Sequence, residues 1–184
     1  VRLLAAHPDV DARRIFILGN SEGCIHALNY QTQSPPIPCA GLVLTAAPGH
    51  PVGDVARTQV AAQLAALPGG EQLLALYDNA MADFAAGRPV AVDESLPELM
   101  RMLLLGVSNP INQPFSRELW TLDPLVLLEQ VTAPVLVVIG KKDIQTDWQG
   151  EGALFADRAA RHADITVDFP ASANHVLKYE PQPR

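Results

Sequence analysis

The sequence predicts an α/β protein with a mostly parallel sheet of about four strands. Three observations indicate this fold class. Short, mostly apolar runs recur along the chain, helical patterns alternate with them, and a glycine or proline soon follows each run. Because parallel sheets are covered on both faces, an uninterrupted apolar run is typical of one of their inner strands.

Four segments are candidate strands, and both faces of the first, which is wholly apolar, are expected to be buried. They are residues 15–18, 41–45, 135–139 and 165–169. The pattern predicts helices at 24–33, directly after the first strand, and at 152–162, between the third and the fourth. Residues 1–6 fit the end of a helix, because Pro8 disfavours helical backbone at the residue before it.

A long segment from about residue 51 to residue 130 breaks this alternation. It contains no strand-like run, and glycines and prolines separate its helical patterns. The expected helices are 55–67, 71–86, 96–105 and 124–130. We therefore expect a core at 1–50, an all-helical insertion at 51–130 and the rest of the core at 131–184.

Composition excludes several classes of protein. Hydrophobic residues make up 48% and charged residues 18% of the chain, which argues against disorder. The formal net charge is -7 with no run of Lys or Arg, so no nucleic-acid partner is expected. No apolar stretch reaches the roughly 18 residues that a membrane span needs. We expect a cytoplasmic protein, because residues 1–6 lack the layout of a signal peptide, but export of a longer parent chain stays open.

The two cysteines, Cys24 and Cys39, are too few for a disulfide framework and have no metal-ligand spacing. We expect both to be small buried side chains. No metal and no organic cofactor is expected.

The segment Gly19-Asn20-Ser21-Glu22-Gly23 matches G-x-S-x-G, the nucleophile-elbow pattern. The pattern alone is weak, but here an apolar strand leads into it and a helix follows, and such a turn lifts the serine oxygen clear of the sheet. The two glycines are expected to leave room for the close approach of backbone and substrate. The helix N-terminus favours an oxyanion, and the backbone N–H of Glu22 is expected to be one of its donors.

A serine hydroxyl needs a base, and the base in turn needs a group that orients it. The expected order in this kind of fold is Ser, then Asp or Glu, then His. Asp143 follows the third strand and His175 the fourth, so both lie in strand-exit loops, where ligands gather in open α/β sheets. Asp147 is the rival acid, and Asp143 is preferred because its shorter tether to the strand holds the carboxylate more firmly.

The other histidines fit the base less well. His7 precedes the elbow, His26 lies on the helix after it, and His162 ends a helix. His50 lies at a strand exit and could line the pocket, but it comes before the acid in the chain.

The sequence around the elbow, the acid and the histidine resembles that of α/β-hydrolases of the esterase and lysophospholipase type. Bacterial serine-aminopeptidase-like and dienelactone-hydrolase-like members are especially similar. The resemblance lies in the stretches HPDVDARRIFILGNSEG, LDPLVLLEQVTAPVLVVIGKKDIQTD and ASANHVLK. It implies that Ser21, Asp143 and His175 are the family's triad, and that the helical insertion is a substrate-covering cap.

The chain departs from these relatives in two ways. They usually have His before the serine, where this chain has Asn20. They also have about four further strands before the elbow, and a loop that supplies the second oxyanion donor. The resemblance therefore implies the C-terminal half of a hydrolase, which alone is expected to be a weak or inactive catalyst. The open strand edge at 14–18 is expected to pair with a second copy or with the missing half.

The expectation is thus a serine hydrolase of carboxylic esters that forms an acyl-enzyme. Two alternatives stay open at this point. One is a peptidase or amidase with the same triad, and the other is an inactive half-domain that acts only by association.

Overall fold

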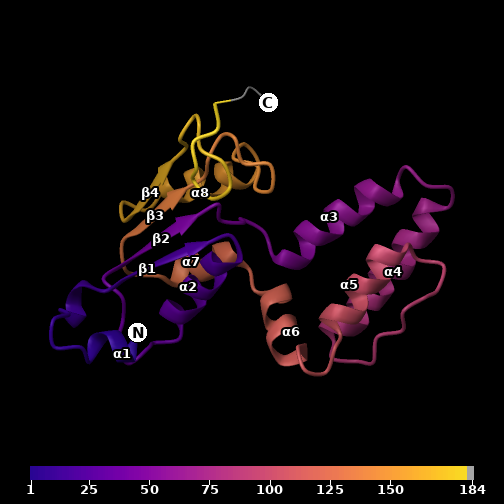
Figure 1. The fold of residues 1–184 in the computed structure, drawn as a ribbon, viewed down its shortest axis with the longest axis horizontal. Helices are drawn as coiled ribbons and strands as arrows, with labels where there is room; N and C mark the ends of the chain where they lie inside the picture. Colours follow the sequence, from indigo (N-terminus) through magenta and orange to yellow (C-terminus); the bar gives the residue numbers. More distant parts are fainter. Residues whose placement is uncertain (182–184) are drawn as a thin grey trace. The chain divides into compact units, whose positions relative to one another are not determined.

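The computed structural model describes residues 1–181, which form two compact units (Figure 1). The first unit contains residues 1–50 and the chain from Asp123 onward, and the second contains Pro51–Leu122. The all-helical segment was expected to end at residue 130 instead. The boundary moves because α7 (Pro124–Gln130) packs against α2 (Glu22–Thr32) of the first unit.

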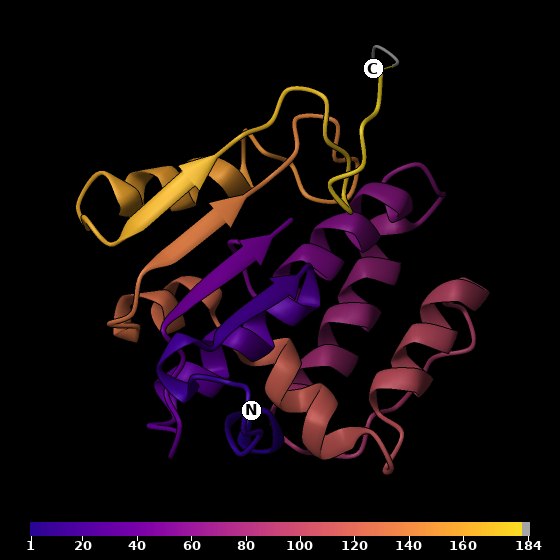
Figure 2. The ribbon, with the colours of Figure 1, turned by 60° about the vertical axis from the view of Figure 1, so that its left-hand side comes forward.

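The first unit is built on one four-stranded sheet in which every neighbouring pair is parallel (Figures 1 and 2). Its strands, in spatial order, are β1 (Phe16–Asn20), β2 (Gly41–Thr45), β3 (Val135–Val138) and β4 (Ile165–Asp168). The predicted fold class and its four strands are confirmed. The spatial order equals the chain order, so each connection runs from one strand to its immediate neighbour.

The burial predicted for β1 is wrong. Phe16 is 60% exposed and Leu18 is 67% exposed, whereas Ile15 beside them is buried. The reason is that β1 is the first strand of the sheet and only one of its faces is covered, by α2. Leu136 of β3, which the register places on the same face as Leu18, is also exposed in part.

The first unit contains four α-helices and one short 3₁₀ turn among the described residues. They are α1 (Arg2–Ala5), a short 3₁₀ turn (Ala12–Arg14), α2, α7 and α8 (Glu151–Ala159). Asp123 caps α7, because its carboxylate accepts the N–H groups of Leu125 and Val126 and Pro124 suits the first helical turn. α2 begins at Glu22, so the helix starts directly after the serine rather than at residue 24.

The second unit contains α3 (Val52–Leu64), α4 (Gly70–Ala85), α5 (Glu98–Val107) and α6 (Gln113–Thr121). Buried side chains of α3, α4 and α5, together with Leu96 just before α5, form one apolar cluster: Val60, Leu64, Tyr77, Ala80, Leu96, Met100 and Leu104. The sequence patterns missed α6. Its proline lies in the first turn, where no intrahelical N–H bond is lost. The segment QPFSRELWT is short and rich in polar residues, so it does not read as an apolar run, although its apolar side chains gather on one face.

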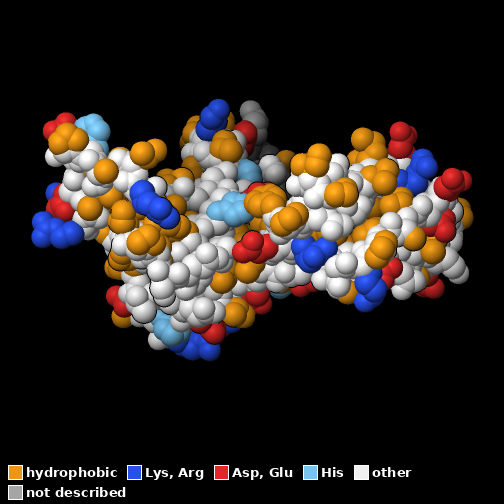
Figure 3. All heavy atoms as spheres, turned by 90° about the horizontal axis from the view of Figure 1, so that it is seen from below, with side chains coloured by type: hydrophobic (Ala, Val, Ile, Leu, Met, Phe, Trp, Pro, Cys, Tyr) orange, Lys and Arg blue, Asp and Glu red, His pale blue; other side chains and the backbone are white. Residues whose placement is uncertain are grey.

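Other expectations can be compared with the described residues. Cys24 and Cys39 are both buried free thiols, as predicted. No helix within residues 1–181 has the length and apolar character needed to cross a bilayer. On the face drawn in Figure 3, the Lys and Arg side chains that are described lie among Asp and Glu rather than in one basic patch.

Candidate active site at the carboxyl edge of the sheet

The three predicted site residues follow three different strands. Ser21 comes directly after β1, Asp143 lies in the loop after β3, and His175 lies in the loop after β4. Because all four strands are parallel, their carboxyl ends lie along the same edge of the sheet. The topology therefore brings the three loops to one edge, where open α/β sheets bind their ligands.

Ser21 occupies a strained backbone conformation at the junction of β1 and α2. Its φ is 54° and its ψ is -122°, a combination that residues with a side chain seldom adopt. The Ser21 N–H donates a hydrogen bond of 2.9 Å to the carbonyl oxygen of Thr45, at the end of β2. This sharp turn is the geometry that a nucleophile elbow requires.

Gly19 permits the turn because the helix backbone lies directly against it. A Cβ at Gly19 would be 2.4 Å from the carbonyl oxygen of Gly23 and 2.7 Å from the backbone nitrogen of Cys24. Gly23 differs, since a Cβ there would meet no atom within 4 Å. The sequence predicts that both glycines leave room for a close approach of the backbone. Within the chain, this holds at Gly19 and is wrong at Gly23.

The first N–H of α2 is available to a ligand. Among the described residues, none accepts a hydrogen bond from the backbone N–H of Glu22. The Glu22 carboxylate is itself paired with the His26 ring, at 3.2 Å between Oε1 and Nε2. The N-terminus of a helix carries a partial positive charge, so the Glu22 N–H fits the role of an oxyanion donor.

Asp143 and His175 form a direct pair. Nδ1 of His175 lies 2.8 Å from Oδ2 and 3.0 Å from Oδ1 of Asp143. The Asp143 side chain is fully buried, and its Oδ1 also accepts the N–H groups of Gln145 and Thr146, at 2.8 and 3.0 Å. A buried carboxylate held by three partners fixes the orientation of the imidazole.

Asp147, the rival acid, has a different role. Its carboxylate accepts the N–H groups of Gln149 and Gly150, at 3.0 and 2.9 Å, just before α8. Within residues 1–181, no hydrogen bond joins Asp147 to His175. The geometry therefore supports Asp143 as the partner of the histidine.

The loops that carry Asp143 and His175 are also joined through their backbones. The N–H of Lys142 donates to the carbonyl oxygen of Ala173 at 3.0 Å, and the N–H of Lys141 to that of Pro170 at 2.9 Å. A Cβ at Gly140 would lie 2.1 Å from the Ala173 carbonyl oxygen. The two loops therefore pack together closely, and only glycine fits at their contact.

The nucleophile and the base are not in hydrogen-bond contact in this structure. Among the described residues, no hydrogen bond joins the Ser21 hydroxyl to Nε2 of His175. In unliganded sites such contacts are often long and tighten only when substrate binds. What joins the two segments here is Asn20, whose amide donates to the His175 carbonyl oxygen at 3.1 Å.

Sequence reasoning named Asn20 only as a departure from relatives, and it missed Thr45. Thr45 is 3% exposed and its hydroxyl accepts a hydrogen bond of 2.9 Å from the Asn20 amide. The available signal was modest: Thr45 is the one polar side chain in an otherwise apolar strand, at its carboxyl end.

A second histidine–carboxylate pair lies at the exit from β2. Nδ1 of His50 is 2.9 Å from Glu151, whose other oxygen accepts the backbone N–H groups of Gly49 and His50. The His50 side chain is 51% exposed, compared with 14% for that of His175. This pair connects the β2 exit loop to α8.

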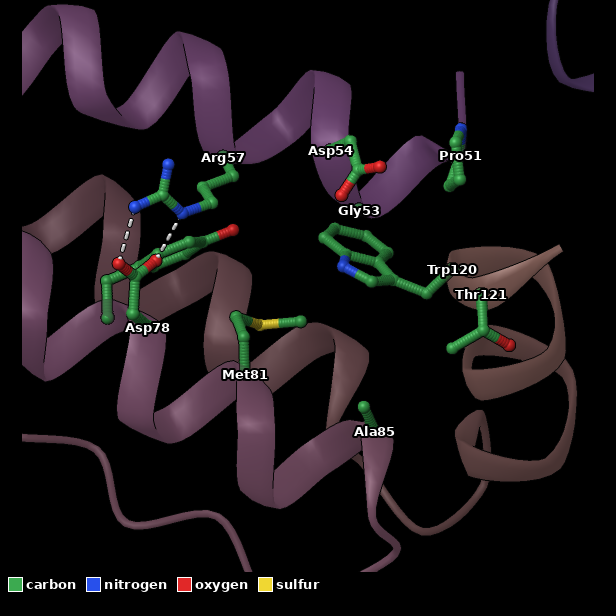
Figure 4. Close-up of a pocket in the computed structure, with 10 residues that line it drawn as sticks. Pro51, Gly53, Asp54, Arg57, Asp78, Met81, Ala85, Trp120 and Thr121 are labelled. Atoms are coloured by element: carbon green, nitrogen blue, oxygen red, sulfur yellow. Dashed lines mark hydrogen bonds and ion pairs between the residues drawn. The ribbon is translucent and has the colours of Figure 1, made fainter. Parts of the chain in front are cut away.

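The second unit has a cavity of about 460 Å³ between α3, α4 and α6 (Figure 4). Arg57 and Asp78 form a two-hydrogen-bond ion pair on one wall, at 2.8 and 2.7 Å. Trp120 and Met81 supply apolar surface on the others. Tyr77 also lines the cavity, and burial, followed by the nearby Asp78 carboxylate, raises the pKa of its hydroxyl.

No family model matches the chain, and no curated protein matches it at a significant level. Many solved structures share its fold, and two of them serve as examples. An acylaminoacyl peptidase from Pyrococcus horikoshii is 12% identical with a TM-score of 0.50, and the match covers 95% of this chain and 22% of the peptidase. An esterase from Pyrococcus furiosus is 18% identical with a TM-score of 0.50, and the match covers 95% of this chain and 50% of the esterase.

The chain thus spans half of that esterase and about a fifth of that peptidase. At such low identity the likeness concerns the fold and not the reaction. The parallel sheet of this chain, with its helices, matches part of the fold of these proteins, which is the α/β-hydrolase fold.

Proposed function

We propose that the chain provides the triad of a serine hydrolase that cleaves carboxylic esters through an acyl-enzyme. Ser21 is the nucleophile, His175 the general base and Asp143 the group that orients the imidazole. The observation that carries this proposal is the buried Asp143–His175 pair, at the sheet edge that also bears the strained Ser21.

Each residue has a defined part in the reaction. Ser21 Oγ attacks the ester carbonyl carbon while Nε2 of His175 takes the hydroxyl proton. The N–H of Glu22 donates to the oxyanion that forms on the carbonyl oxygen. The tetrahedral intermediate then expels the alcohol, which receives its proton from His175, and leaves an ester bond to Ser21.

Water completes the cycle by the same route. His175 removes a proton from the water, which attacks the acyl-enzyme carbon, and then returns a proton to Ser21 Oγ as the acid leaves. Asp143 stabilises the imidazolium through Nδ1, from which it accepts a hydrogen bond of 2.8 Å.

The preference for esters comes from the sequence resemblance to esterases and lysophospholipases. The same resemblance supports a cap role for the second unit. A peptidase or amidase would use the same residues, so paired ester and amide substrates with one acyl group distinguish these activities. Faster turnover of the amide would replace the ester proposal while leaving the triad in place.

The proposal is tested by labelling with a fluorophosphonate, which reacts with activated serines. Ser21 should be modified in the folded chain, and both Ser21→Ala and His175→Ala should abolish the labelling. The control is Ser34→Ala. Ser34 also has a positive φ, of 48°, but lies in an exposed loop away from any strand end.

The control variant should label at the wild-type rate. Labelling of the folded wild-type chain no faster than that of Ser21→Ala would contradict the proposal. Such a result would favour the inactive half-domain.

A further inference from the structure

The elbow and the histidine loop are held together by one side chain. Within residues 1–181, the hydrogen bond between the Asn20 amide and the His175 carbonyl oxygen, at 3.1 Å, is the only one between residues 19–23 and residues 170–180. By contrast, the histidine and aspartate loops share two backbone bonds and the carboxylate pair. Several hydrogen bonds therefore fix the position of His175 relative to Asp143, whereas the bond from Asn20 is the one direct hydrogen bond between the elbow and the histidine loop among the described residues.

Thr45 fixes the Asn20 amide in place. Nδ2 of Asn20 donates to the Thr45 hydroxyl at 2.9 Å, and that hydroxyl donates in turn to the carbonyl oxygen of Gly19 at 3.2 Å. The carbonyl oxygen of Thr45 accepts the N–H of Ser21 at 2.9 Å. The backbone of the nucleophile and the amide that reaches the base are thus both held by one buried residue of β2.

We propose that Asn20 is a positioning residue that sets the distance between Ser21 and His175 through this bond. The inference rests on the proposed triad, because it concerns how the base is placed beside the nucleophile. Asn20 acts through the backbone of His175 and does not touch the reacting atoms. It makes the elbow, β2 and the histidine loop one hydrogen-bonded unit.

The chemistry of the amide explains why asparagine suits this position. Its NH₂ group has two protons, and two oxygens, one on Thr45 and one on His175, lie within 3.1 Å of it. Aspartate has nearly the same shape but only acceptors, so it would face the His175 carbonyl oxygen with a negative charge. Alanine would leave that oxygen without its donor.

The experiment compares Asn20→Asp and Asn20→Ala with Thr45→Val in the whole chain. Thr45→Val removes the hydroxyl that accepts from the Asn20 amide, but it leaves both the amide and the His175 carbonyl oxygen in the chain. Three quantities are measured: the second-order rate of fluorophosphonate labelling at Ser21, the NMR resonance of the His175 Nδ1 proton, and the urea midpoint of unfolding. His175→Gln identifies the resonance by its loss.

We expect both Asn20 variants to label about 5- to 10-fold more slowly than wild type, the factor that one net hydrogen bond supplies. The His175 Nδ1 resonance should move or broaden in both. In Thr45→Val the unfolding midpoint should fall, and this resonance should move less than in the Asn20 variants, because the amide loses the Thr45 hydroxyl but still faces the His175 carbonyl oxygen. If Asn20→Asp does not fold, Asn20→Ala alone is compared with wild type in the same measurements.

Two results would overturn the inference. In one, the Asn20 variants label at the wild-type rate with an unmoved resonance. In the other, they lose stability but the resonance moves no more than in Thr45→Val, which is the pattern of a merely structural residue. If the folded wild type is not labelled at Ser21 but the resonance moves in Asn20→Asp, the proposed function fails while the link between Asn20 and His175 stands.

Discussion

Gly19→Ala should destabilise the chain, and the structure gives the size of the effect. The added Cβ would lie 2.4 Å from the carbonyl oxygen and 2.6 Å from the carbonyl carbon of Gly23. Both neighbours are backbone atoms of α2, which cannot rotate away as a side chain can. The junction of β1 and α2 must therefore shift, and overpacking of this kind costs about 1–3 kcal/mol.

Gly23→Ala is the matched control in the same pentapeptide. Its Cβ would meet no atom within 4 Å, and the residue lies in the first turn of α2. Alanine is more favourable than glycine in a helix by about 0.5–1 kcal/mol. The two glycine-to-alanine changes should therefore have opposite signs, although they add the same methyl group only four positions apart in the chain.

The measurement is urea unfolding followed by circular dichroism, with wild type and both variants under the same conditions. We expect the midpoint to fall in Gly19→Ala and to stay or rise in Gly23→Ala, with equal slopes. Equal stability of Gly19→Ala and wild type would refute the steric argument. A loss in Gly23→Ala as large as that in Gly19→Ala would show that close approach inside the chain is not what distinguishes the two positions.

Three further predictions follow from the site and the sheet. Asp143→Asn should lower the turnover rate about 10⁴-fold, as in other serine triads, while Asp147→Asn should lower it much less. Both rates are measured by steady-state kinetics with whichever of the ester and amide substrates the wild type turns over faster. Reversed effects would make Asp147 the acid. Burial raises the pKa of the Cys24 thiol from 9.0 to about 12, so below pH 9 the reactive thiolate is about a thousandfold scarcer than in an ordinary cysteine. Iodoacetamide should therefore modify Cys24 only after unfolding. Fast modification of the native chain would contradict this. The exposed edge at β1 should make the chain self-associate, and Leu18→Lys should weaken that association in sedimentation experiments; a folded wild-type monomer at micromolar concentration would argue against edge pairing.

Much of the core was predictable from the sequence because the information lies in neighbouring residues. The bounds of β2 and α7 agree with the prediction residue for residue, since an apolar run and a capped, proline-started helix are local patterns. The elbow is also local, because a strand, a tight turn and a helix follow one another within a few residues. The chain order of Ser21, Asp143 and His175 then proposed the site without any knowledge of distance.

Tertiary structure decided what depends on segments far apart in the chain. Asp143 and Asp147 lie in the same loop after β3 and were both candidates for the acid, and only the packed loops show that Asp143 faces His175 while Asp147 binds the start of α8. The exposure of Phe16 depends on which elements cover the two faces of β1, and an apolar run does not encode what covers it. The bond from Asn20 to His175 joins residues 155 positions apart, and its formation requires the whole parallel sheet, because only the shared carboxyl edge brings those two loops within hydrogen-bond distance.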